Sequence, residues 1–186
     1  MKKLAIFDLD GTLFDTVRVN YLSYQAALKP FGYAVDERFF REQCFGHDFG
    51  TFGPWLAPEL DEEGLRQVHE AKKACYPSFL GEAVKNEHLF RMLHTMRQDY
   101  HTALVTAGSR ANSSAILEQF GELASFDLLL TSEDVPRPKP DPVGFQMAMA
   151  HFGVTPEDTI IFEDSETGIA AAKASKAQLM IVDGFH

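Results

Sequence analysis

The sequence contains no long hydrophobic run, and its basic residues are outnumbered. Its 186 residues include 17 Lys and Arg against 27 Asp and Glu, a formal net charge of −10. Because nucleic acids and anionic membrane surfaces are bound by basic patches, we expect neither as a partner. No apolar run approaches the roughly 18–20 residues of a membrane helix. The first run, residues 4–7, ends at Asp8 and is shorter than the roughly 7–15 residues of a signal-peptide core.

Cysteine is scarce as well. Cys44 and Cys75 are the only two, which is too few for a disulfide framework and forms no paired metal-binding motif. We interpret both as reduced packing residues of a cytoplasmic protein. The hydrophobic fraction of 45 % is typical of a globular protein that needs no disulfides to bury a core. None of these features predicts an oligomeric state.

Short apolar runs alternate with amphipathic segments in the second half of the chain. Such alternation predicts an α/β fold, a parallel sheet with helices on both faces. The expected strands are residues 4–7, 102–106, 126–130, 159–162 and 179–182. The expected helices are residues 86–98, 111–120, 142–152 and 166–174.

The segment 15–83 interrupts this alternation directly after the first strand. Its patterns predict helices over 17–28, 36–45 and 62–76, a loop rich in Gly and aromatic residues over 44–55, and no good strand. We expect the aromatic residues Phe49, Phe52 and Trp55 to form the core of this insert. The predicted organisation is a discontinuous α/β core, residues 1–14 and 84–186, with an inserted α-helical cap, residues 15–83.

Polar side chains follow four of the expected strands, at the edge where ligands of parallel sheets bind. They comprise four carboxylates, a hydroxyl beside a glycine turn, and one lysine: Asp8, Asp10, Glu163, Asp164, Thr106 and Lys139. Clustered carboxylates stay ionised only with a cation, and an all-oxygen ligand set favours Mg²⁺. A carboxylate nucleophile, a second carboxylate and a divalent cation are the groups that phosphoryl transfer requires.

Four segments resemble the four motifs of the haloacid dehalogenase (HAD) superfamily, in the family's order. They are FDLDGTLFDT at 7–16, VTAGS at 105–109, RPKPDP at 137–142 and FEDSETGI at 162–169. The last two are most similar to the branch of β-phosphoglucomutase and phosphoglycolate phosphatase. The resemblance implies a HAD-like Rossmannoid sheet with a small inserted helical cap of the C1 type.

The resemblance also implies a role for each acidic residue. Asp8 is the expected nucleophile and a metal ligand. Asp10 is expected to protonate the leaving oxygen and then activate water, with its backbone carbonyl on the metal. Asp164 is expected to complete the metal sphere, with Glu163 beside it as a ligand or an outer-shell partner. A second aspartate such as Asp10 is missing from the dehalogenating members, so dehalogenation is disfavoured.

The same resemblance assigns the phosphate contacts. Thr106 and the backbone N–H of Ala107 are expected to bind phosphate oxygens. Lys139 is expected to tie the phosphate to the Asp8 carboxylate. The implied activity is Mg²⁺-dependent hydrolysis of a small phosphorylated metabolite through an aspartyl-phosphate.

Substrate selection would fall to the cap. His47 and Asp48 are candidates because they lie in the Gly-rich loop, although a solvated loop explains them equally well. Lys72 and Lys73 are candidates for a distal anionic group, against the simpler reading as surface lysines. Asn20 stands where mutase members carry a histidine, and the cap loop has no arginine. Both departures weaken the alternative of a β-phosphoglucomutase-like mutase; a catalytically silent binding protein of the same fold is the second alternative.

Overall fold

The computed structural model describes residues 2–47, 49–183 and 185. Its backbone contacts divide the chain into two compact units. We call residues 1–15 with 84–186 the core unit, and residues 16–83 the cap unit. Within the described residues, no helix has both the length and the apolar character needed to cross a membrane.

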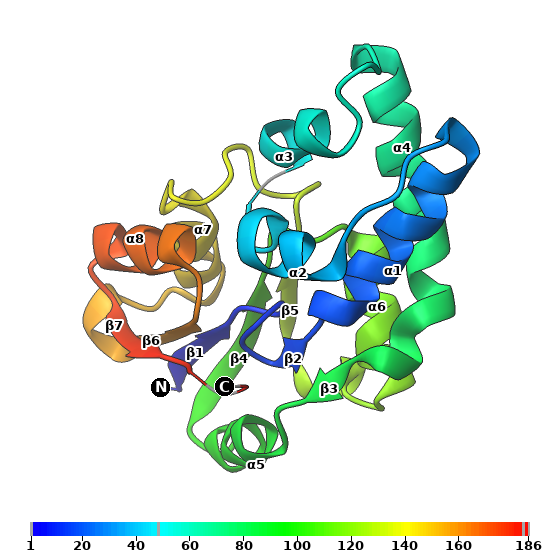
Figure 1. Cartoon of the computed structure of the whole chain (residues 1–186). Helices are drawn as coiled ribbons and strands as arrows, with labels where there is room; N and C mark the ends of the chain where they lie inside the picture. Colours follow the sequence, from blue (N-terminus) through cyan, green and yellow to red (C-terminus); the bar gives the residue numbers. More distant parts are fainter. Residues whose placement is uncertain (1, 48, 184, 186) are drawn as a thin grey trace. The chain divides into compact units, whose positions relative to one another are not determined.

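The core unit is built on a five-stranded sheet with the strand order β5-β4-β1-β6-β7 (Figure 1). All four neighbouring pairs in this sheet are parallel. A separate antiparallel ribbon pairs β2 with β3, through Phe14 with Lys85 and Asp15 with Val84. The strands are β1 (Lys3–Phe7), β2 (Phe14–Asp15), β3 (Val84–Lys85), β4 (Tyr100–Val105), β5 (Leu128–Leu130), β6 (Thr159–Glu163) and β7 (Gln178–Ile181).

Strand β1 lies in the middle of the sheet, which explains its continuous apolar sequence. Ile6 pairs with Ala103 of β4 on one side and with Ile161 of β6 on the other. Residues 4–7 are fully buried. The chain leaves β1 at Asp8, so the first carboxylate of the HAD-like motif lies at the carboxyl end of the central strand.

Four helices cover the two faces of the sheet. Right-handed crossovers place the helices before and after β4 on one face and the helices flanking β6 on the other. Figure 1 shows α5 and α6 on the side of the sheet away from α7 and α8. These helices are α5 (Glu87–Met96), α6 (Arg110–Gln119), α7 (Val143–Phe152) and α8 (Glu166–Ser175).

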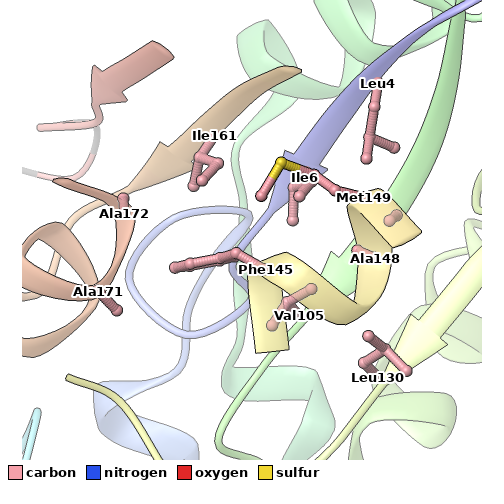
Figure 2. Close-up of a cluster of buried hydrophobic side chains, with 11 residues drawn as sticks. Leu4, Ile6, Val105, Leu130, Phe145, Ala148, Met149, Ile161, Ala171 and Ala172 are labelled. Carbon is pink, nitrogen blue, oxygen red and sulfur yellow. The ribbon is translucent and has the colours of Figure 1, made fainter. Parts of the chain in front are cut away.

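The two faces have different cores. Figure 2 shows aliphatic side chains of the strands packed under α7 and α8, including Ile6 against Phe145 and Met149. On the opposite face, Phe7 stacks on its register partner Phe162 with ring centroids 4.5 Å apart. The sheet is therefore buried on both sides, as an all-parallel sheet requires.

The sequence predicted every helix and strand of the large sheet to within about two residues, and the α/β fold class is confirmed. The ribbon of β2 and β3 was not predicted. Two-residue strands carry no periodicity. This ribbon is held instead by Asn86, whose backbone N–H donates to Leu13 O at 2.9 Å and whose amide donates to Thr12 O at 3.2 Å.

The cap unit is helical. Its α-helices are α1 (Val17–Leu28), α2 (Glu37–Phe39), α3 (Phe49–Leu56) and α4 (Glu62–Cys75). A π-helical turn covers Phe40–Cys44, and 3₁₀ turns cover Lys29–Phe31 and Tyr76–Glu82. Two further 3₁₀ turns, Leu123–Ser125 and Pro156–Asp158, belong to the core unit.

One cap prediction was wrong, and another was right in extent. The helix expected over 36–45 is present over residues 37–44, but its second part is a π-turn in which the Phe45 N–H donates to Phe40 O at 3.0 Å. The expected loop over 44–55 contains helix α3 despite its glycines. Packing overrides the low helix propensity of glycine there: the Phe49 ring lies over Gly53, where a Cβ would be 2.9 Å from it.

The cap has its own aromatic core around Tyr24. The Tyr24 ring lies 5.3 Å from the rings of Phe49 and Phe52 and 5.7 Å from Phe40, all between centroids. Cys44 is fully buried against this cluster, and both cysteines are free thiols. The prediction that Trp55 belongs to this core was wrong, because its side chain is 51 % exposed.

A half-buried histidine belongs to the same cluster. The His69 ring stacks on Phe49 at 4.8 Å, and its Nδ1 lies 3.4 Å from the Tyr24 hydroxyl. Burial lowers the pKa of His69 to about 4, and the positive charges of Lys73 and Lys72 contribute.

We predict that the cap loses stability on acidification through His69. The His69 side chain takes up a proton near pH 6.5 in the unfolded chain but only near pH 4 in the folded chain. The free energy of unfolding therefore falls as the pH drops from 6.5 to 4. Urea unfolding of His69→Gln should therefore depend less on pH between 6.5 and 4 than unfolding of the wild type. His47→Gln, at an exposed histidine of the same unit, is the matched control and should keep the wild-type slope.

Candidate active site

Two acidic groups are fixed by neighbouring strands of the core unit. The Asp8 N–H donates to Phe162 O at 3.0 Å, which extends the pairing of β1 and β6 to the first carboxylate. Glu163 is the last residue of β6, and Asp164 follows it. Asp8 is 6 % exposed and Glu163 is fully buried, so the fold carries two carboxylates into a desolvated position.

Lys139 joins these two carboxylates. Its Nζ lies 2.6 Å from Asp8 Oδ1 and 2.5 Å from Glu163 Oε1. It also donates to the backbone carbonyl of Val105 at 3.1 Å. The Lys139 side chain is only 12 % exposed, so the loop between β5 and α7 brings a buried ammonium to the carboxyl ends of β1 and β6.

The second oxygen of Glu163 is also fully engaged. Oε2 accepts hydrogen bonds from the backbone N–H groups of Asp164 at 2.9 Å and Ser165 at 3.0 Å, and from the Ser165 hydroxyl at 3.0 Å. Gly168, in the first turn of α8, leaves the room for this carboxylate, because a Cβ there would overlap it. These bonds hold Glu163 in one orientation, with Oε1 aimed at Lys139.

An acidic cluster that fits a metal ion lies at the same edge. Asp8, Glu163 and Asp164 each offer one carboxylate oxygen, and the three atoms lie within 4.8 Å of one another. Asp8 uses Oδ1 for Lys139, and Asp164 uses Oδ1 to accept from the Thr12 hydroxyl at 2.6 Å. Both oxygens of Glu163 accept hydrogen bonds, from Lys139 and from the backbone that follows it.

The charges of this cluster do not balance without a cation. Three carboxylates face one ammonium, which leaves two negative charges uncompensated. Burial raises the pKa of Asp8 well above its usual range. The positive charge of Lys139 lowers this pKa, and the negative charges of Glu163 and Asp164 raise it further. Burial also raises the pKa of Asp164 to about 6. Burial alone would lower the pKa of Lys139, but Asp8 and Glu163 raise it.

The turn after β4 presents hydroxyl and amide groups. The Thr106 N–H donates to Leu130 O at 3.0 Å, and the Thr106 Oγ1 accepts from the Gly108 N–H at 3.0 Å. Ala107, between them, is exposed. Asp10 Oδ2 lies 3.7 Å from the point where a Cβ of Gly108 would stand, so the second aspartate of the DxD pair faces this turn.

The core unit thus gathers the predicted catalytic, phosphate and metal residues at one edge of its sheet.

The candidates for substrate selection lie in the cap unit. The Asn20 amide donates to Thr16 O at 3.0 Å, and His47 is exposed. The Lys72 ammonium lies 5.2 Å and 4.9 Å from the Tyr24 and Tyr76 ring centroids. Lys73 pairs with Glu70 at 3.1 Å, and Asp48 falls outside the described residues.

Three residues that hold the site were missed from the sequence. Thr12 orients Asp164, Ser165 binds Glu163, and Gly168 leaves space for the same carboxylate. The signal was present for one of them. A serine directly before a helical segment is typical of an N-cap, and Ser165 Oγ does accept from the Gly168 N–H at 3.1 Å.

Comparisons with known proteins agree with this arrangement. The model of the family described as haloacid dehalogenase-like hydrolase matches residues 5–182. Validoxylamine A 7'-phosphate phosphatase of Streptomyces hygroscopicus subsp. limoneus is 31 % identical over 93 % of this chain and 82 % of its own. Phosphorylated carbohydrates phosphatase of Thermotoga maritima is 27 % identical over 92 % of this chain and 80 % of its own.

A solved structure supports the same fold. The crystal structure of a predicted phosphoglycolate phosphatase from Haemophilus somnus 129PT has a TM-score of 0.88 to this chain, at 24 % sequence identity. The superposition covers 98 % of this chain and 86 % of that one.

We predict that Gly168→Ala disrupts the site by displacing Glu163. The new Cβ would overlap the Glu163 carboxylate, so Glu163 must move and its buried ion pair with Lys139 breaks. Breaking a buried ion pair in this way costs about 3 kcal/mol or more, which denaturant unfolding would detect. Gly81→Ala is the matched control, because nothing lies within 4 Å of its Cβ position. Equal stability of the two variants would contradict the prediction.

Proposed function

This chain belongs to the haloacid dehalogenase-like hydrolase family, and we propose that it hydrolyses a small phosphorylated metabolite through an aspartyl-phosphate with Mg²⁺. The family predicted from the four motifs is confirmed, and so is the enzyme class of a phosphatase, the name its relatives carry. The observation that carries the proposal is the buried Asp8 carboxylate, held by Lys139 beside the metal-binding cluster.

The donor set fits Mg²⁺. Asp8 and Asp164 use Oδ1 for Lys139 and for Thr12, and we propose their Oδ2 atoms as ligands, with the Asp10 carbonyl as the third. Oxygen ligands suit this hard cation. We assign Glu163 to the outer shell, because both of its oxygens are already bound. When bound, the cation neutralises the excess negative charge and attracts the phosphate oxygens.

Asp8 is the proposed nucleophile. Its carboxylate oxygen attacks phosphorus, a P–O bond to Asp8 forms, and the P–O bond to the leaving alcohol breaks. Lys139 keeps Asp8 in a fixed orientation for this attack, and Glu163 keeps Lys139 charged and in place. Thr106 Oγ1 and the Ala107 N–H are the proposed donors to the phosphoryl oxygens.

Asp10 is the proposed proton carrier. It gives a proton to the alcohol oxygen as that oxygen leaves, and it takes a proton from the water that then attacks phosphorus. The second attack breaks the P–O bond to Asp8 and releases inorganic phosphate. The proximity of Asp10 to the Thr106–Gly108 turn supports this role, because the proton is needed next to the bound phosphoryl group.

The cap unit is proposed to select the substrate. Asn20, His47, Asp48, Lys72 and Lys73 stay candidates for this selection. Two relatives are named for phosphorylated carbohydrates or for a phosphorylated validoxylamine, which supports a polyhydroxylated phosphate ester as the substrate class. The two free thiols are consistent with the proposed cytoplasmic location.

We expect Asp8→Asn to lose nearly all phosphatase activity. The amide has the shape of the carboxylate but is a poor nucleophile, and loss of covalent catalysis of this kind costs several orders of magnitude in rate. Turnover of a generic phosphate ester would be measured with Mg²⁺ and after chelation, which should also abolish activity. Asp99→Asn, at an exposed acid of the core unit, is the control. Wild-type turnover by Asp8→Asn would refute the nucleophile assignment.

The products should distinguish hydrolysis from isomerisation. The Asn20 side chain is an amide that donates to Thr16 O and Oγ1, and it offers no titratable group for a mutase reaction. We therefore expect one inorganic phosphate for each sugar monophosphate consumed and no isomeric sugar phosphate, as followed by phosphate assay and chromatography. An isomer formed without phosphate release would favour the mutase instead.

A further inference from the structure

One buried hydroxyl near the phosphate-binding turn has no hydrogen-bond partner. Ser113 lies in the first turns of α6 and is 1 % exposed. Among the side-chain polar atoms of the described chain, its Oγ is the only buried one without a partner. An unsatisfied buried hydroxyl lowers the stability of a folded protein. The proposed function gives Ser113 no role, so this cost is unexplained.

The position of Ser113 is unusual because of its neighbours. A Cβ on Gly108 would lie 3.1 Å from Ser113 Oγ, 3.4 Å from Thr106 Oγ1 and 3.7 Å from Asp10 Oδ2. Three oxygens from three separate segments therefore surround the open side of one glycine. Two of them belong to residues proposed to handle the phosphoryl group.

The Thr106 hydroxyl has an unused proton in the same place. Its oxygen accepts from the Gly108 N–H at 3.0 Å, and no described residue accepts its proton. A hydroxyl oxygen has two lone pairs, so Thr106 Oγ1 has the capacity for one more donor. The Thr106 hydroxyl can therefore donate its proton to an incoming oxyanion and accept a second hydrogen bond at the same time.

We propose that Ser113 is a positioning residue for the phosphoryl group and acts through Thr106. When a phosphoryl oxygen binds, the Thr106 hydroxyl donates to it, and the Ser113 hydroxyl, which has no partner in the structure, turns to donate to Thr106 Oγ1 across the open side of Gly108. The chain of two hydrogen bonds polarises the Thr106 O–H and fixes its direction. This inference rests on the proposed function, because it deepens the account of the same phosphate site.

The proposal predicts opposite effects of one substitution on stability and on activity. Ser113→Ala removes an unsatisfied group from the ligand-free protein, so its Tm should equal or exceed that of the wild type. The same change should lower kcat/KM about three- to tenfold, the value of one ordinary hydrogen bond. Ser175→Ala is the matched control, since Ser175 is buried and its hydroxyl donates to Ala172 O at 2.7 Å. That variant should lose stability and keep its activity.

Two further measurements test the path through Thr106. In a double-mutant cycle, Ser113→Ala should have little additional effect on kcat/KM once Thr106→Val is present. In thermal unfolding with Mg²⁺, inorganic phosphate should raise the Tm of Ser113→Ala by less than it raises the Tm of the wild type and of Ser175→Ala.

The outcomes separate this inference from the proposed function. Wild-type protein that turns over no phosphate ester would count against the proposed function, and the phosphate-induced Tm shift would still decide the role of Ser113. Wild-type kcat/KM and a full phosphate-induced shift in Ser113→Ala would overturn the inference. Additive effects of the Thr106 and Ser113 substitutions would also overturn it, because Ser113 would then not act through Thr106.

Discussion

The site depends on one buried ammonium between two buried carboxylates. Lys139 lies within 2.6 Å of Asp8 Oδ1 and of Glu163 Oε1, with its side chain almost entirely shielded from water. Desolvating three charges is expensive, and only close geometry with complete hydrogen bonding offsets the cost. The surroundings of Glu163 meet this demand, because all of its remaining acceptor capacity is used by Asp164 and Ser165.

The same constraint makes the carboxylates of the cluster easier to protonate. Burial raises the pKa values of Asp8 and Asp164, so their negative charges are disfavoured at this position. Lys139 compensates only part of the charge of the cluster. A divalent cation would remove the remaining imbalance. In the reaction proposed above, such a cation would also let an acidic protein hold an anionic phosphate.

The sequence predicted those parts of the site that depend on the backbone. Asp8 and Glu163 follow from the ends of two adjacent parallel strands, and parallel strands bring their carboxyl ends to one edge. The direction of a side chain does not follow from this rule. Only the structure shows that Glu163 Oε1 lies 2.5 Å from Lys139 Nζ, and that the Ser113 hydroxyl has no partner among the described residues. In the cap, packing on Tyr24 makes a helix of a segment whose glycines predicted a loop.

Each unit has a hydrophobic core of its own, and this separation has a chemical consequence. The proposed nucleophile, proton carrier and phosphate contacts all belong to the core unit, whereas every candidate for substrate selection belongs to the cap unit. The Tyr24 cluster and the aliphatic cluster under α7 share no residue. Substitutions that change the cap therefore need not disturb the packing under Lys139. The buried ion pairs of Lys139 with Asp8 and Glu163 depend on close geometry, so substitutions near them are costly. We therefore expect that a new substrate specificity arises more readily through cap residues than through residues of the core.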